Sequence, residues 1–102
     1  MRVLVFFDLP VKTKKDRKRY AEFRKSLIKM GFCMIQFSVY SRTVKNSDDA
    51  CGFEKRIEAI VPEKGSVRLM TVTEKQYAGI KILAGERLKS ENLLDTKDIL
   101  EL

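Results

Sequence analysis

A short apolar run that ends on a carboxylate and a proline constrains the fold of this 102-residue chain more than any other feature. Val3–Phe7 is apolar at every position and rich in β-branched and aromatic residues, as a strand covered on both faces requires. Pro10 disfavours helical backbone at Leu9, so Asp8 lies at the end of this strand or in the turn after it. We therefore expect a buried strand that presents one acid at its carboxyl end.

The next segment, from about Thr13 to Met30, has helical periodicity. Apolar residues recur every three or four positions, so they form one stripe on a helix, and lysines occupy the opposite side. Gly31 is a typical helix end. The stripe contains Tyr20, Phe23, Leu27 and Met30, and the lysines are Lys14, Lys18, Lys25 and Lys29. This pattern predicts a helix that packs one face on a sheet and turns a basic face to solvent.

The remainder of the chain alternates between strand and helix patterns. Phe32–Val44 favours either one bent strand or two short strands. Asn46 or Ser47 can cap a second helix that stops before Pro62, and Ser66–Thr73 again alternates as a strand. This order predicts an α+β fold, a ferredoxin-like βαββαβ sandwich, in residues 1–85.

Three further local predictions concern the C-terminal part. Thr73–Gln76 has the spacing of a capping box and predicts a short helical turn, and Ile80–Ala84 is a candidate strand. Residues 86–102 form a polar tail that ends in an apolar patch, Asp98–Leu102. We expect this patch to be an extra C-terminal strand exchanged with a neighbouring subunit.

The net positive charge is confined to one segment. Lys12–Lys29 contains nine basic and two acidic residues and therefore carries +7, which is the net charge of the whole chain. A localised positive field of this kind indicates a polyanionic partner, most often nucleic acid. The alternative is a solvated helix face that keeps the protein in solution, and charge alone does not decide between the two.

The composition excludes several kinds of catalytic site. The chain has no histidine, which removes the usual general base near neutral pH, and it has no Gly-rich phosphate loop or zinc-ligand pattern. A carboxylate such as Asp8 remains, and it either caps the following turn or binds a metal ion such as Mg²⁺. One carboxylate is a poor site, whereas two chains around a twofold axis can share one ion between their Asp8 side chains.

Two expectations concern the surroundings of the chain. No apolar run approaches the length of a membrane span, so we expect a cytoplasmic protein without a membrane partner. No basic residue interleaves the aromatic residues in the sequence, so they favour core or dimer contacts over platforms for base stacking. These aromatic residues are Phe6, Phe7, Phe32 and Phe37.

Four motifs in one order resemble a known family. They are "FFDLP" at the end of the first strand, "KMGF" at the end of the basic helix, "QFSVYS" at Gln36–Ser41 and "GSVRLMTVTEKQY" at Gly65–Tyr77. Together they are similar to the small CRISPR-associated endoribonuclease family, the second Cas protein (Cas-two), and "VTEKQY" resembles the form found in type II systems. The resemblance covers most of the chain.

The resemblance implies a symmetric homodimer with a magnesium site built from the Asp8 of both subunits. It also implies that Arg17 and Arg19 match the family's paired arginines on the first helix. Gln36, Ser38 and Tyr40 match a motif that is mainly architectural, with Ser38 and Tyr40 as candidate neighbours of the site. The predicted nucleic-acid-binding residues are Lys14, Arg17, Lys18, Arg19 and Lys25.

The function implied by the resemblance is CRISPR spacer acquisition. In that role the dimer binds double-stranded DNA and acts with the CRISPR integrase, the first Cas protein, in a larger complex. It also implies a magnesium-dependent endonuclease that uses Asp8 on single-stranded RNA or double-stranded DNA. Two alternatives remain open from the sequence: a purely structural DNA-binding bridge, and a stand-alone, toxin-like ribonuclease.

Overall fold

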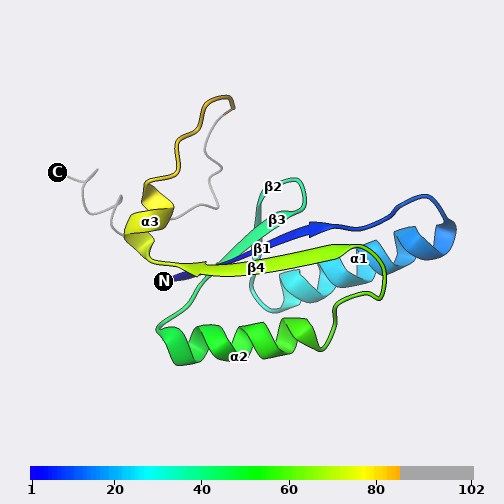
Figure 1. Ribbon diagram of the computed structural model, residues 1–102, viewed down its shortest axis with the longest axis horizontal. Coiled ribbons are helices and arrows are strands. Elements are labelled where there is room, and N and C mark those ends of the chain that lie inside the picture. The colour runs from blue at the N-terminus through cyan, green and yellow to red at the C-terminus, as the bar shows by residue number, and fades with distance from the viewer. Residues whose placement is uncertain (86–102) are drawn as a thin grey trace.

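The structure of the protein is a computed structural model that describes residues 1–85 (Figure 1). The strand predicted at Asp98–Leu102 lies outside the described residues. The elements follow the predicted βαββαβ order, with a short helix added after the last strand. They are β1 (Arg2–Asp8), α1 (Lys14–Lys29), β2 (Cys33–Gln36), β3 (Val39–Thr43), α2 (Ser47–Glu58), β4 (Ser66–Val72) and α3 (Glu74–Ala78). The α+β class and the element order are thus as predicted.

The strands form one antiparallel sheet in the order β2-β3-β1-β4. β1 is an inner strand with a neighbouring strand on each side, and its alternate residues belong to the two faces of the sheet. The segment Phe32–Val44, left open as one strand or two, forms the β2–β3 hairpin, with a register shift between Met34 and Gln36. The hairpin turn at Phe37–Ser38 lies beside the end of β1, because the Phe7 amide donates a hydrogen bond of 3.1 Å to the Ser38 carbonyl.

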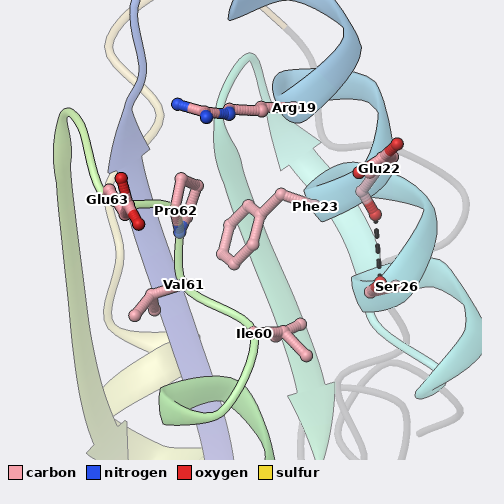
Figure 2. Close-up of a pocket in the computed structure, with 8 residues that line it drawn as sticks. All are labelled: Arg19, Glu22, Phe23, Ser26, Ile60, Val61, Pro62 and Glu63. Carbon is pink, nitrogen blue, oxygen red and sulfur yellow. Dashed lines mark hydrogen bonds between the residues drawn. The ribbon is translucent and has the colours of Figure 1, made fainter.

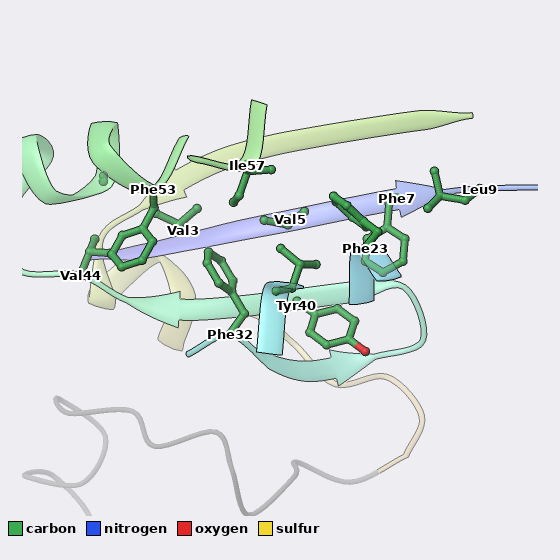
Figure 3. Close-up of a cluster of buried hydrophobic side chains, with 12 residues drawn as sticks. Val3, Val5, Phe7, Leu9, Phe23, Phe32, Tyr40, Val44, Phe53 and Ile57 are labelled. Carbon is green, nitrogen blue, oxygen red and sulfur yellow. The ribbon is translucent and has the colours of Figure 1, made fainter. Parts of the chain in front are cut away.

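Both long helices pack on the same face of the sheet (Figure 1). Val3, Val5 and Phe7 of β1 point toward them and form the main core (Figure 3). α1 contributes its predicted apolar stripe to this core, and α2 contributes Ala50, Phe53 and Ile57. The core therefore fixes the layer in which the basic helix α1 lies.

The helix starts also follow the sequence predictions. Asn46 caps α2 by accepting a hydrogen bond of 2.9 Å from the Asp49 amide. Thr73 opens α3 with the predicted capping box, in which its hydroxyl accepts from the Gln76 amide and its own amide donates to the Gln76 side chain. Each cap satisfies helix N–H groups that have no partner within the helix.

The opposite side of the sheet is largely uncovered, and we refer to it as the open face. Residues paired across antiparallel strands share a face, so the pairs in register with Leu4, Phe6 and Asp8 define it. α3 covers only the end of this face nearest Arg2, where Tyr77 packs with Leu4. The open face consists of Leu4, Phe6, Asp8, Val39, Ser41, Ser66, Arg68 and Met70.

An ion pair attaches α3 to the sheet. The Arg2 side chain is 4% exposed and its Nε donates to Glu74 Oε1 at 2.7 Å. The Arg2 guanidinium also lies 4.2 Å from the centre of the Tyr77 ring, a cation–π distance. α3 is therefore attached at the Arg2 end of β1, and the Asp8 end of the open face stays uncovered by it.

One predicted strand is wrong. Ile80–Ala84 has no strand structure, and its apolar residues Ile80, Ile82 and Leu83 are exposed. The physical reason is that α3 leads the chain away from the β4 edge, so no neighbouring strand among residues 1–85 pairs with this segment. In the described part of the chain, no helix is long and apolar enough to cross a membrane.

Candidate nucleic-acid interface and metal site

Asp8 is the last residue of β1 and lies at the uncovered end of the open face. It pairs in register with Ser66 of β4 and its side chain is exposed. Within residues 1–85, its carboxylate has no hydrogen-bond or ion-pair partner. The turn-capping role that the sequence left open thus has no supporting contact there, and the carboxylate remains available to a ligand.

A shallow hollow of about 490 Å³ surrounds this carboxylate. The ends of β1 and β4 and the turn of the β2–β3 hairpin contribute its walls. We call it the Asp8 hollow, and its lining residues are Phe6, Phe7, Asp8, Phe37, Ser38, Val39, Ser66 and Arg68. It combines a carboxylate, an arginine, two hydroxyls and an exposed aromatic ring, which is the chemistry of a polar ligand site.

The backbone at Asp8 is held from two sides. On the helix side, the buried Phe7 ring packs against the rings of Phe23 and Tyr40, with centroids 5.1 and 5.6 Å away. On the other side lies Gly65, whose φ of +97° falls in the region that favours glycine. A β-carbon at Gly65 would lie 2.7 Å from the Asp8 carbonyl oxygen. Close packing therefore fixes the backbone position from which the Asp8 side chain projects.

The donor set of one chain supplies only part of a magnesium site. Among the described residues, no three His, Cys, Asp or Glu side chains lie together as a metal site. The hollow offers one carboxylate, from Asp8, and the hydroxyls of Ser38 and Ser66. Mg²⁺ prefers oxygen ligands and is commonly held by one or two carboxylates and several waters. The residues present fit such an ion best if a second copy adds its own Asp8.

Three of the predicted nucleic-acid-binding residues lie together on the outer side of α1. Lys14, Lys18 and Lys25 are exposed, and their spacing places them opposite the buried residues Phe23 and Leu27. We call them the outer lysines. α1 covers the helix-side face of the sheet, whereas Asp8 belongs to the open face. The fold therefore groups the lysines with one another but places them in a different layer from the carboxylate.

Arg17 has a structural contact. Its Nη1 donates hydrogen bonds of 3.1 Å to the carbonyls of both Val11 and Lys12. These bonds link the first turn of α1 to the connection that follows Asp8. Arg17 thus stabilises this connection, and its exposed side chain also adds positive charge beside the outer lysines.

Arg19 lines a groove on the flank of α1 (Figure 2) and is not one of the outer lysines' neighbours along the same helical stripe. The groove has a volume of about 390 Å³ and carries the acids Glu22 and Glu63 on its walls. These negative charges disfavour a phosphate backbone there. We call it the lateral groove, and its lining residues are Arg19, Glu22, Phe23, Ser26, Ile60, Val61, Pro62 and Glu63.

A charged cluster under the start of α1 also involves Arg19. Burial raises the pKa of the Asp16 carboxyl, but hydrogen bonds from Thr13 and the positive charges of Lys64 and Arg19 outweigh it and hold that pKa below its usual range. The Thr13 hydroxyl in turn accepts from the Asp16 amide at 3.0 Å. Arg19 therefore helps keep Asp16 ionised as part of the helix cap.

The "QFSVYS" motif divides between core and site. Tyr40 is 1% exposed, and its hydroxyl accepts a hydrogen bond of 2.7 Å from Arg24 Nε. It does not line the Asp8 hollow, whereas Ser38 does. Ser38 has a φ of +63°, which turns the hairpin tip toward the end of β1. Gln36 is exposed and ends β2. The motif is thus largely architectural, and Ser38 is its member at the site.

The sequence missed three members of the hollow: Phe37, Ser66 and Arg68. Side chains alternate between the two faces of a strand, so the sequence of β4 does indicate that Ser66 and Arg68 share a face. The sequence does not show that this face adjoins Phe6 and Asp8, because the pairing of β4 with β1 joins residues about 60 positions apart.

Comparison with known proteins adds an independent observation. The sequence profile described as "CRISPR associated protein Cas2" matches residues 1–80. The chain belongs to the Cas2 family. The resemblance noted from the four sequence motifs is thereby confirmed, and the Asp8 hollow and the outer lysines are features of a Cas2 family member.

Curated relatives share much of the sequence. A protein named CRISPR-associated endoribonuclease Cas2, from Acidovorax ebreus, is 48% identical and covers 97% of this chain and 97% of its own length. Another of the same name, from Treponema denticola, is 54% identical over 84% of this chain and 85% of its own length. The crystal structure of Streptococcus pyogenes Cas2 at pH 6.5 matches with a TM-score of 0.63 and 23% identity, covering 82% of this chain and all of that one. The structural match supports the βαββαβ fold of the Cas2 family.

Proposed function

We propose that the protein is a dimeric nucleic-acid-binding subunit of CRISPR spacer acquisition that acts with the CRISPR integrase. We further propose that it is a magnesium-dependent endonuclease whose catalytic and metal-binding residue is Asp8. The observation that carries the proposal is the exposed Asp8 carboxylate at the uncovered end of an apolar sheet face. The family and the names of its curated relatives support the nuclease activity.

The open face supports a twofold dimer. On this face Met70 of the edge strand β4 is 49% exposed, and Phe6 of β1 and Val39 of β3 are only partly buried. Burying such a surface against a second copy is favourable by about 25 cal/mol for each Å² of apolar area. A twofold axis near the uncovered end would also bring the two Asp8 carboxylates together, which completes the partial magnesium site of one chain.

The edge of β4 offers a further contact. In the described part of the chain, β4 pairs only with β1, so its outer edge has free N–H and C=O groups. An added strand would satisfy these groups, as in other cases of strand addition. We propose that the Asp98–Leu102 segment of a partner subunit pairs there.

A charge placed on the open face tests the dimer. Met70→Glu would put a carboxylate in the contact and, by symmetry, a like charge near it, so we expect the dimer dissociation constant to rise by about tenfold or more. Sedimentation equilibrium measures this constant. Val61→Glu is the matched control, since Val61 is a similarly exposed apolar residue on the lateral groove. Equal dissociation constants for Met70→Glu and wild type would contradict the proposed interface.

The residues of the hollow would position a phosphodiester for cleavage. Asp8 would hold Mg²⁺, with Ser38 and Ser66 as neighbouring oxygen donors. When bound, such an ion stabilises charge on a phosphate and lowers the pKa of a water molecule, which suits a chain without histidine. Arg68, on the same wall, would orient the substrate through a phosphate oxygen.

The outer lysines support binding of duplex DNA. A dimer would carry two sets of outer lysines, one on each outer layer. A DNA duplex can contact these lysines without entering the Asp8 hollow. Contacts of lysine with phosphate are independent of sequence and weaken with salt. Because the lysines and Asp8 lie in different layers, DNA binding is separable from cleavage, and this favours the DNA-binding bridge as the second candidate function.

Reversing the charge of the outer lysines tests this surface. We expect Lys14→Glu/Lys18→Glu/Lys25→Glu to weaken duplex binding and to reduce the slope of log affinity against log salt by about 0.9 for each phosphate that the variant no longer neutralises. Fluorescence anisotropy over a salt series measures both. The matched control is Lys45→Glu/Lys55→Glu/Lys75→Glu, which makes the same charge change at exposed lysines elsewhere. If both triple variants have the same slope, the outer lysines are not the DNA-binding surface.

A further inference from the structure

Phe37 lines the Asp8 hollow, and its aromatic side chain is largely exposed to solvent. It is 79% exposed at the tip of the β2–β3 hairpin. Its ring lies parallel to that of Tyr20, with an interplanar angle of 23° and centroids 6.3 Å apart. Tyr20 can shield only one face of the Phe37 ring, so the other face is open to solvent. Burying this face in the monomer would need a ligand.

The tip that carries Phe37 is held in place. The Ser38 carbonyl accepts a hydrogen bond of 3.1 Å from the Phe7 amide, and the Ser38 hydroxyl lies 3.5 Å from the hydroxyl of Tyr20. The turn is thus attached to both β1 and α1. A ring on such a turn is a preorganised surface and loses little freedom when a ligand packs on it.

Phe37 shares the Asp8 hollow with an arginine. Arg68 is exposed, pairs in register with Phe6, and has no ion-pair or hydrogen-bond partner among residues 1–85. The hollow therefore presents a flat ring, a free cation and a carboxylate together. Its volume of about 490 Å³ is within the range of small-ligand sites. These groups match the base and the phosphate of a single nucleotide.

We propose that the Phe37 ring stacks on an unpaired base of single-stranded RNA while Arg68 contacts an adjacent phosphate, so that Phe37 selects unpaired over duplex substrate at the Asp8 hollow. This inference rests on the proposed nuclease site. A base inside a duplex is stacked on its neighbours and cannot lie on the ring, whereas an unpaired base can. The basic and aromatic groups, which are separated in the sequence, meet through the pairing of β1 with β4.

The chain allows a direct measurement of stacking, because it contains no tryptophan. Phe37→Trp introduces a single tryptophan at the proposed contact, and its fluorescence can be excited separately from that of the three tyrosines. We expect single-stranded RNA, added in EDTA to prevent cleavage, to quench its fluorescence in a saturable manner. An oligonucleotide of the same length with abasic sites supplies the phosphates without the bases. We expect it to bind about 5- to 150-fold more weakly. Equal affinity and equal quenching with the abasic strand would overturn the proposal.

Phe37→Leu and Phe37→Tyr separate stacking from simple apolar contact. The leucine variant keeps an apolar side chain without a ring, so we expect its affinity for single-stranded RNA to fall about fivefold or more. The tyrosine variant retains the ring and should bind as wild type does. Binding of duplex DNA through the outer lysines should be unchanged in both. Wild-type RNA affinity in Phe37→Leu would overturn the proposal.

The oligomeric state distinguishes base stacking from a dimer contact. We expect wild type and Phe37→Leu to have the same mass by sedimentation equilibrium. A leucine variant that dissociates would assign the ring to the subunit interface and overturn the proposal. Magnesium-dependent cleavage by Phe37→Leu distinguishes the proposed nuclease site at Asp8 from the proposed stacking on Phe37. If this variant cleaves RNA and binds it with wild-type affinity, the stacking role of Phe37 is wrong and the Asp8 site is retained. A wild-type protein that neither binds nor cleaves RNA overturns both.

Discussion

Replacing Asp8 with asparagine is expected to lower the rate of magnesium-dependent cleavage by about 10³-fold. The stabilisation of transition-state charge by a bound metal ion is worth several kcal/mol, and each 1.36 kcal/mol corresponds to about a factor of ten in rate. In a twofold dimer one substitution removes both carboxylates from the site. Asparagine has nearly the same size, and Asp8 makes no hydrogen bond or ion pair within residues 1–85, so the fold should be unaffected. Single-turnover cleavage of a labelled oligonucleotide measures the rate.

The matched control for this variant is Asp48→Asn. Asp48 is an exposed acid in the first turn of α2, outside the Asp8 hollow, so its replacement makes the same chemical change away from the site. Its cleavage rate should equal that of wild type. Cleavage by Asp8→Asn at the wild-type rate, in the same magnesium concentration, would rule out Asp8 as the catalytic residue.

The second large effect is expected at Phe7. Its side chain is 6% exposed and contacts the rings of Tyr20, Phe23 and Tyr40, so it joins β1 to both α1 and β3. Phe7→Ala would leave a cavity where these elements meet, and we expect the free energy of unfolding to fall by about 3–5 kcal/mol. This is a large part of the stability of an ordinary domain. Urea denaturation at a fixed protein concentration measures it, since dimerisation would make the midpoint depend on concentration.

Phe37→Ala is the control for the Phe7 variant. It makes the same truncation at an exposed ring, so we expect a change in stability of no more than about 0.5 kcal/mol. A loss below about 1 kcal/mol for Phe7→Ala would show that the aromatic cluster does not hold β1 against the helices. The Asp8 backbone would then depend mainly on Gly65 for its position.

The outer lysines and the Asp8 carboxylate lie in different layers, so the proposed DNA binding and the proposed cleavage depend on different residues. The outer lysines lie on the helix layer and Asp8 lies on the sheet layer, so the residues proposed to hold a duplex differ from those proposed to cleave a strand. Loss of either set should therefore leave the other activity in place. Under the proposed function, such a subunit would serve spacer acquisition by binding alone, and the Asp8 hollow would act on a separate, single-stranded substrate.

Local patterns in the sequence were enough for most of the secondary structure. The apolar run before Asp8, the helical stripe through Phe23 and the capping residues Asn46 and Thr73 each encode their element through short-range spacing. The candidate strand at Ile80–Ala84 failed because an apolar pattern does not say whether a pairing partner is available. A strand depends on a neighbour, whereas a helix satisfies its own backbone.

The candidate site was only half predictable. The sequence singled out Asp8 as a lone acid at a strand end and the outer lysines as one face of a helix, because both follow from local geometry. The absence of interleaved basic residues in the sequence favours a core or dimer position for Phe37, but the side chain is 79% exposed and lies outside the core of the described residues. In the fold, Arg68 lines the same hollow as Phe37.

Short-range spacing was sufficient to identify the central strand, the basic helix and the acid that ends the strand, since each of these features depends on residues a few positions apart. The grouping of Asp8, Phe37 and Arg68 around one hollow, in a different layer from the outer lysines, depends on the three-dimensional fold. The physical reason is that sheet order and register are set by packing of the whole core, which joins β1 to β4 across more than half of the chain.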